Sequence, residues 1–118
     1  GNTMQPEGLF EALERLHAYQ RFPSIVVTEN GTAIPDELEG ERVYDQRRID
    51  YFRRHLAQVL RAQRAGVPVD GYFVWSLLDN FEWAEGYVPR FGLVYVDFAS
   101  QRRVVKDSGH WFRRFLGA

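Results

Sequence analysis

Apolar residues recur at helical spacing in two parts of the chain. The first part begins at Pro6, a residue suited to the first turn of a helix, and ends before Phe22-Pro23, where proline interrupts a helical backbone. The second runs from about Asp45 to Ala65 and is stopped by Gly66. The apolar faces of these two predicted helices carry Leu9, Phe10, Leu13, Leu16 and His17 in the first, and Ile49, Phe52, Leu56, Val59 and Leu60 in the second.

Two shorter segments, Ile25–Thr28 and Gly71–Leu78, are almost continuously apolar and predict strands. A continuous apolar run such as "GYFVWSLL" is typical of a parallel strand covered on both faces. Because a helix separates the two runs, they predict a strand–helix–strand unit with Ile25–Thr28 and Tyr72–Leu77 as parallel neighbours. Glu29 and Trp75 would then lie at the C-terminal ends of these strands.

The last part of the chain predicts a small hairpin and a helix. The stretch "GLVYVDFASQRRVVK" alternates between apolar and polar residues as a hairpin does. Ser108 is a suitable N-cap for a final helix. The apolar residues of that helix are Trp111, Phe112, Phe115 and Leu116.

This inventory predicts an α/β chain that is part of a larger sheet. Two parallel strands alone leave unpaired backbone groups at both edges, so they need further strands. A (β/α)8 barrel takes about 250 residues. We therefore interpret residues 1–118 as the C-terminal fragment, roughly the last quarter with the preceding helix, of a single (β/α)8 barrel domain.

Composition removes several classes of function. The formal net charge of the 118 residues is -1, and no basic run points to nucleic acid or to an anionic membrane surface. The chain has no cysteine, and its three histidines (His17, His55 and His110) are too scattered to predict a metal site. We expect no cofactor, and His55 and His110 are expected to pack or cap. The N-terminal "GNTMQPEG" does not resemble a signal peptide, so a cytoplasmic location is expected.

The stretch "SIVVTENG" ends a buried run on the carboxylate of Glu29. A carboxylate at the end of a buried strand costs stability unless something pairs with it. Two interpretations follow from these residues alone: Glu29 forms an ion pair, or it takes part in a reaction.

Nine of the eighteen aromatic residues fall between Tyr72 and Phe98. Core packing is the favoured role for Tyr72, Phe73 and Tyr95. Trp75 and Trp83 differ, because they bracket polar residues at a strand end: Asp79, Asn80 and Glu82. A flat indole beside carboxylates and amides is suited to a sugar ring, whose C–H groups stack while its hydroxyls form hydrogen bonds.

Two separate motifs resemble glycoside hydrolase family 1, the β-glucosidase and β-galactosidase group of (β/α)8 barrels. "VVTENG" is similar to the strand-seven nucleophile motif of that family, and "GYFVWSLLDNFEWAEGYVPRFGLVYVDF" to its strand-eight sugar-binding segment. "PEGL" precedes both, and four residues lie at the expected helical places between them: Asp45, Arg48, Tyr51 and His55. The resemblance covers essentially the whole chain.

The resemblance implies roles for five residues. Glu29 is similar to the catalytic nucleophile of a retaining β-glycosidase, which forms a covalent glycosyl-enzyme. Glu82 and Trp83 correspond to the pair that contacts the O4 and O6 side of the sugar, Trp75 to the platform beneath the ring, and Phe91 to a residue that closes the same subsite. The roles of Asp79 and Asn80 are left open between loop structure and substrate contact. The resemblance also implies a cis peptide between Trp75 and Ser76.

The family's acid/base glutamate belongs to an Asn-Glu-Pro motif, and this chain has no such motif. Activity is therefore expected to need a complementary chain that carries the first six barrel strands. Relatives that act on 6-phosphorylated sugars generally have serine at the place of Glu82 and a lysine-tyrosine pair further on, where this chain has Pro89. The expected substrate is an unphosphorylated β-glycoside, whether glucoside, galactoside or fucoside.

Two alternatives remain at this point. The chain could be a non-catalytic carbohydrate-binding or folding module that keeps half a sugar pocket. It could also belong to a thioglucosidase, which manages without a general acid because its leaving group is already good. A complementary polypeptide that contains Asn-Glu-Pro would favour the catalytic interpretation.

Overall fold

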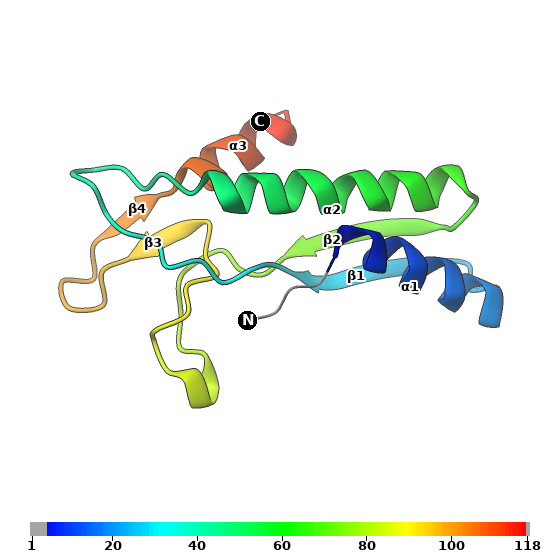
Figure 1. The fold of residues 1–118 in the computed structure, drawn as a ribbon, viewed down its shortest axis with the longest axis horizontal. Coiled ribbons are helices and arrows are strands. Elements are labelled where there is room, and N and C mark those ends of the chain that lie inside the picture. The colour runs from blue at the N-terminus through cyan, green and yellow to red at the C-terminus, as the bar shows by residue number, and fades with distance from the viewer. Residues whose placement is uncertain (1–4, 118) are drawn as a thin grey trace. The chain divides into compact units, whose positions relative to one another are not determined.

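The computed structural model describes residues 5–117; the first four residues of "GNTMQPEG" lie outside that range. The elements follow one another as α1 (Pro6–Tyr19), β1 (Ile25–Asn30), α2 (Gln46–Arg64), β2 (Val69–Val74), the short 3-10 helix η1 (Trp83–Glu85), β3 (Val94–Val96), β4 (Arg103–Val105) and α3 (Asp107–Phe115) (Figure 1). All three predicted helices are present. The second, α2, begins and ends within one residue of the predicted Asp45 and Ala65. No helix among the described residues is both long and apolar enough to cross a membrane.

The described residues divide into two compact units. The first unit comprises residues 5–30 and 51–74, and the second comprises residues 31–50 and 75–117. The first unit contains α1, β1, β2 and most of α2. The second contains the loop after β1, the first residues of α2, the long loop after β2, the hairpin and α3.

In the first unit, β1 and β2 pair in parallel, as the sequence predicts (Figure 1). Ile25 lies opposite Val69 and Asn30 opposite Val74, so the two strands end together. Helix faces pack over the strands to form the core, whose buried members are Phe10, Leu13, Ile25, Val59, Ala62, Val67 and Val69. The strand pair is therefore fixed mainly by apolar packing against helices.

The observed strand bounds correct the prediction. β1 continues past Thr28 to include Glu29 and Asn30, because Asn30 still pairs with Val74. β2 begins at Val69 and ends at Val74, so the apolar residues 75–78 are not part of it. Hydropathy alone could not separate them, since the backbone of residues 76–79 pairs with a different segment, residues 91–94.

Within this chain, only one face of the strand pair is covered. Ile25 and Val69 are buried, but Val26 is 43% exposed and Phe73 is 61% exposed. Neighbouring residues of a strand point to opposite faces, and the pairing skips Asp70 between Val69 and Gly71, so Val69 and Phe73 do not share a face. One face of the pair thus packs on the helices and the other is open.

In the second unit, β3 and β4 form the expected antiparallel hairpin, with Val94 opposite Val105 and Val96 opposite Arg103. The loop that carries η1 extends away from this hairpin (Figure 1). Ser108 is not the N-cap of α3, because the helix already begins at Asp107. Instead, Asp45 accepts hydrogen bonds from both the backbone N–H and the hydroxyl of Ser108. A distant carboxylate therefore satisfies the free N–H that a local cap would have taken.

Candidate active site

Glu29 is the penultimate residue of β1 and is exposed. Because β1 and β2 are parallel and end together, Glu29 stands at the C-terminal end of the pair, and Trp75 follows the last residue of β2 in the chain. The C-terminal ends of barrel strands are where active sites of this fold lie. The expected end of the strand is thus confirmed for the carboxylate.

Gly31, the glycine of "TENG", is required by a close backbone approach. A Cβ atom at this position would lie 1.8 Å from the carbonyl oxygen of Trp75, which no side chain allows. Within the second unit, the segment that follows Glu29 therefore passes directly against the backbone of Trp75. The peptide between Trp75 and Ser76 is cis, as the resemblance implies.

Two of the predicted sugar-binding residues contact each other. The indole Nε1 of Trp75 donates a hydrogen bond to Oε1 of Glu82 at 3.3 Å. The bond holds a flat apolar ring beside a charged acceptor, the combination that a sugar needs. Trp75 and Glu82, seven residues apart in the sequence, are thus brought together by the loop.

Trp83 begins η1 and has a positive φ of 46°, a conformation that bulky side chains rarely adopt. Its side chain belongs to the exposed large hydrophobic residues, with 85% of its surface accessible. The tight turn is closed by hydrogen bonds from Glu82 N–H to the Gly86 carbonyl at 2.6 Å and from Gly86 N–H to the Trp83 carbonyl at 3.1 Å. Such strained backbone is concentrated at functional sites in proteins.

Phe91 is partly buried, and its carbonyl accepts a hydrogen bond from Ser76 N–H at 3.1 Å. Leu93 N–H returns a bond to the Ser76 carbonyl at 2.9 Å. Phe91 therefore lies at the base of the loop that carries Glu82 and Trp83. Its expected role in closing the same subsite stays a prediction.

The role of Asp79 is left open by the sequence. In the structure, its carboxylate is bound by other groups of the protein. It is 3% exposed, and its carboxylate accepts hydrogen bonds from the backbone N–H groups of Gly92 at 3.0 Å and Val96 at 3.3 Å. It also binds Arg90 at 2.7 Å and Lys106 at 2.8 Å. Among the two interpretations, the structure favours loop structure for Asp79.

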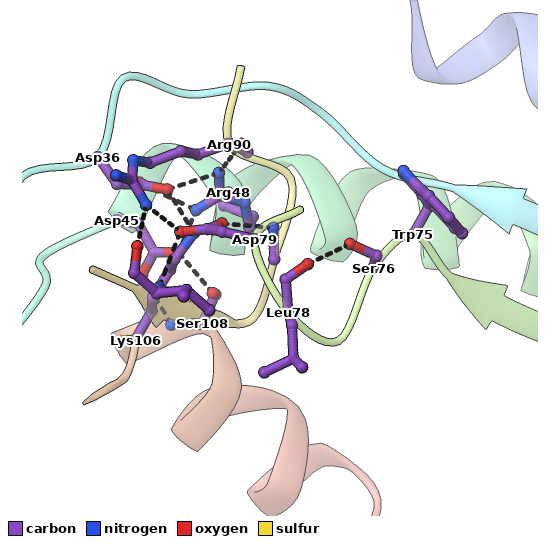
Figure 2. A network of polar contacts seen from close by, with 12 residues as sticks. Asp36, Asp45, Arg48, Trp75, Ser76, Leu78, Asp79, Arg90, Lys106 and Ser108 are labelled. Atoms are coloured by element: carbon purple, nitrogen blue, oxygen red, sulfur yellow. Dashed lines mark hydrogen bonds and ion pairs between the residues drawn. The ribbon is translucent and has the colours of Figure 1, made fainter. Parts of the chain in front are cut away.

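Asp79 belongs to a buried network that sequence analysis missed (Figure 2). Lys106 Nζ also binds Asp36 at 2.6 Å, and Arg48 binds Asp36 at 2.9 Å and Asp45 at 2.6 Å. The network thus joins three carboxylates to three cations: Asp36, Asp45, Asp79, Arg48, Arg90 and Lys106. One signal could have found it: Lys106 lies two residues after Val104, on the inward side of the alternating strand.

The electrostatic setting of Lys106 combines opposing effects. Burial lowers its pKa from the ordinary value, and the nearby Arg48 lowers it further. Hydrogen bonds to Asp36 and Asp79 act in the opposite direction, because they favour the charged ammonium. The network is a matched set of charges in which each cation depends on its carboxylates.

His55 packs in the first unit, as expected. It is 1% exposed, its ring stacks on Tyr51 at 3.9 Å between centroids, and Nδ1 donates a hydrogen bond to the Tyr51 carbonyl at 2.8 Å. Burial lowers its pKa, so the neutral ring is favoured. Nearby, the hydroxyl of Tyr72 donates a hydrogen bond to Asn30, and burial raises the pKa of Tyr72.

Within residues 5–117, no three His, Cys, Asp or Glu side chains gather in a way that could hold a metal ion.

The family model for glycosyl hydrolase family 1 matches residues 1–118. This chain belongs to glycosyl hydrolase family 1. The resemblance deduced from the two motifs is therefore confirmed, and with it the assignment of the chain to a family of glycosidases.

Several β-glycosidases are similar to this chain in sequence. Beta-glucosidase A of Thermotoga maritima is 54% identical over 113 residues, which cover 95% of this chain and 25% of the relative. A bifunctional beta-D-glucosidase/beta-D-fucosidase of Bifidobacterium breve is 53% identical, with 98% of this chain and 26% of the relative covered. A 6-phospho-beta-galactosidase of Clostridium acetobutylicum is 46% identical over 92% of this chain.

Solved structures give the same result. The family 1 β-glucosidase from Thermotoga maritima, in complex with isofagomine lactam, superposes with a TM-score of 0.94 at 50% identity and covers 96% of this chain. The match covers 26% of that β-glucosidase. This chain therefore spans about a quarter of the length of its TIM-barrel relatives.

Proposed function

We propose that this chain carries the nucleophile and part of the sugar pocket of a retaining β-glycosidase. Glu29 is the nucleophile; Trp75, Glu82, Trp83 and Phe91 bind the sugar. The observation that carries the proposal is the hydrogen bond between Trp75 and Glu82, which joins an aromatic platform to a hydroxyl acceptor in a family of glycosidases. The exposed position of Glu29 at the end of β1 supports its role.

The mechanism takes two displacements. The Glu29 carboxylate forms a bond to the anomeric carbon while the bond to the leaving oxygen breaks and a general acid gives that oxygen a proton. Water then breaks the glycosyl-enzyme bond, as the same group, now a base, accepts a proton from the water. Glu29 must therefore be ionised at the start of each cycle.

The general acid comes from outside these 118 residues, because the chain has no Asn-Glu-Pro motif. The first six strands of the barrel would supply it, with the strands seven and eight formed by β1 and β2. The open face of this pair, which includes Val26 and Phe73, supports such a partner, because exposed apolar side chains gain free energy on burial. The chain alone is expected to be inactive, and addition of the complementary part should restore hydrolysis.

An unphosphorylated β-glucoside, β-galactoside or β-fucoside is the proposed substrate class. The Glu82 carboxylate suits sugar hydroxyls and would repel a phosphate on O6. Names of the relatives include both unphosphorylated and 6-phospho sugars, so the comparison of an aryl β-glucoside with its 6-phosphate is the direct test. We expect kcat/KM at least tenfold higher for the unphosphorylated compound, a factor that corresponds to about 1.4 kcal/mol.

Replacement of the nucleophile tests the mechanism. In the enzyme assembled from this chain and the remaining strands, Glu29→Ala should keep the fold and lose turnover. Added azide should then attack the anomeric carbon directly and give the glycosyl azide of inverted configuration, because one displacement occurs instead of two. The product is identified by NMR of the anomeric proton.

Glu85→Ala is the matched control, because it removes an exposed carboxylate from η1 and should leave turnover and product unchanged. A glycosyl azide of retained configuration, or a Glu29→Ala variant with near-normal rates, would remove Glu29 from the role. An assembly that binds the sugar and never hydrolyses it would favour the non-catalytic carbohydrate-binding alternative.

A further inference from the structure

Residues 80–90, which we call the glycone loop, are irregular apart from η1. The Trp75–Glu82 hydrogen bond and the ring contacts of Tyr87 with Phe81 and Phe98 hold part of the loop. The loop contains η1, and four of its large apolar side chains are exposed: Phe81, Trp83, Tyr87 and Val88. A loop with few buried contacts is free to change orientation unless its ends are held. The base of the loop therefore contributes to the direction of Glu82 and Trp83, together with the Trp75–Glu82 hydrogen bond.

The backbone at the base forms a short ladder. Ser76 pairs with the backbone of Phe91 and Leu93, and Asp79 N–H donates to the Val94 carbonyl at 3.1 Å. Ladder bonds fix the separation of the two ends. The Asp79 side chain adds bonds across the base, to Gly92 N–H at 3.0 Å and to Val96 N–H at 3.3 Å.

Arg90, the last residue of the loop, is held from two sides. Its Nη1 binds Asp79 at 2.7 Å and the Val96 carbonyl at 2.8 Å, and its guanidinium lies 4.1 Å from the centre of the Tyr95 ring. Its own carbonyl accepts a hydrogen bond from Arg48 at 2.7 Å and from Ile34 N–H at 3.1 Å. Both the side chain and the backbone of the final loop residue are thus fixed.

Lys106 connects this base to the segment after β1. Its ammonium lies between Asp79 at 2.8 Å and Asp36 at 2.6 Å, and all three side chains are at most 1% exposed (Figure 2). Asp36 belongs to the same stretch of chain as Gly31, which passes against the Trp75 carbonyl. One set of charges therefore holds both the glycone loop and the segment that follows the proposed nucleophile.

We infer that Asp79 is a positioning residue for sugar recognition, an inference that rests on the proposed function. Its carboxylate does not touch the sugar; it sets the orientation of the glycone loop, and with it the reach of Glu82 and Trp83 toward the O6 side of the ring. A carboxylate is needed because every group that faces it is a donor: two backbone N–H groups, Arg90 and Lys106. In an asparagine of the same shape, one oxygen is replaced by an NH2 group that faces donors.

The test compares two substrates in the assembled enzyme: an aryl β-glucoside and the matching aryl β-xyloside, which lacks the C6 hydroxymethyl group. Asp79→Asn should lower kcat/KM for the glucoside about tenfold more than for the xyloside, because only the glucoside uses contacts on the O6 side. For the glucoside, we expect much of the loss in kcat/KM to result from a higher KM. A structural defect alone would lower kcat/KM by the same factor for both substrates.

Asp45→Asn is the matched control. Asp45 is as deeply buried as Asp79, but its own hydrogen bonds go to Arg48 and Ser108, and it reaches the base of the loop only through Arg48, which bonds the Arg90 carbonyl. This variant should lose stability and change the ratio of glucoside to xyloside activity much less than Asp79→Asn does. Arg90→Lys, at a residue that is only 17% exposed in its side chain, is the milder second variant and should change the ratio in the same direction by about threefold.

Equal losses for both substrates in Asp79→Asn, or an equal change of ratio in Asp45→Asn, would overturn the inference. If Asp79→Asn does not fold, Arg90→Lys decides by the same ratio. Failure of the proposed function has a different signature, namely a Glu29→Ala variant with normal rates while the wild-type ratio stays measurable. An assembled wild-type enzyme that hydrolyses neither glycoside removes both proposals.

Discussion

Glu29, the proposed nucleophile, and Glu82, a proposed sugar-binding residue, are held by different means. Glu29 extends from a strand whose neighbours in the first unit are packed on an apolar core that includes Ile25 and Val69. Glu82 stands on an irregular loop whose base, in the second unit, is held by buried ion pairs around Asp79. Regular structure places a side chain through its own backbone ladder, whereas an irregular loop needs polar side chains to supply the missing bonds.

This difference predicts different responses to substitution. A core variant in the first unit loses packing free energy and leaves the remaining groups satisfied. A variant in the charge network leaves buried partners without a counter-charge, so the loss is larger and the loop is affected as well.

The largest effect is expected at Lys106. Lys106→Met removes the cation between Asp36 and Asp79 and leaves two buried carboxylates short of a partner. The free energy of unfolding should fall by about 3–5 kcal/mol, as measured by chemical denaturation. Leu13→Ala, in the core of the first unit, is the comparison and should cost about 2–5 kcal/mol.

The two variants should also differ in specificity. Lys106→Met should lower the ratio of glucoside to xyloside activity, while Leu13→Ala should leave that ratio unchanged. A Lys106→Met protein with wild-type stability and an unaltered ratio would show that the network is dispensable. The contrast between the two units would then disappear.

The next effect is expected where the two segments of the second unit touch. Gly31→Ala would place a Cβ atom 1.8 Å from the Trp75 carbonyl oxygen, so the backbone must move. Misplacement of about 1 Å near reacting groups can cost about a hundredfold in rate, and we expect a loss of that order in kcat/KM. Ala33→Ser, at an exposed position two residues later, is the control and should be close to wild type. Wild-type activity in Gly31→Ala would mean that the close approach has no role.

The smallest effect concerns pH and the first unit. Burial lowers the folded-state pKa of His55 below its value of about 6.5 in an unfolded chain, so between these two pKa values the unfolded chain binds more protons. Stability should therefore fall as the pH drops below about 6.5, with a slope of at most about 1.4 kcal/mol per pH unit from this group. Unfolding is measured at pH 7.0 and 5.5, values chosen to be roughly either side of that pKa.

His55→Phe keeps the aromatic ring beside Tyr51 and removes the titrating group. Its stability should change less between the two pH values than that of the wild type. An identical pH dependence in His55→Phe and wild type would show that His55 does not cause the loss.

The sequence by itself determined the helices, the parallel strand pair and the family. Helical spacing located α1 and α2, continuous apolar runs located β1 and part of β2, and two motifs identified the family. These features depend on residues close together in the chain, where periodicity and motif spacing carry the information. The remaining differences lay in the bounds of the strands: β1 is longer than predicted and β2 lies three residues earlier, because its end depends on which segment pairs with Ser76.

Only the tertiary structure decided the role of Asp79 and the place of Ser108. Asp36, Asp79 and Lys106 are separated by 27 to 70 residues in sequence, so no local pattern could pair them. Ser108 has the chemistry of an N-cap, but Asp45, 63 residues away, takes its N–H and leaves it inside the helix. The physical reason is the same in both cases: a buried charge or N–H group must be satisfied, and which distant group satisfies it is settled when the chain folds.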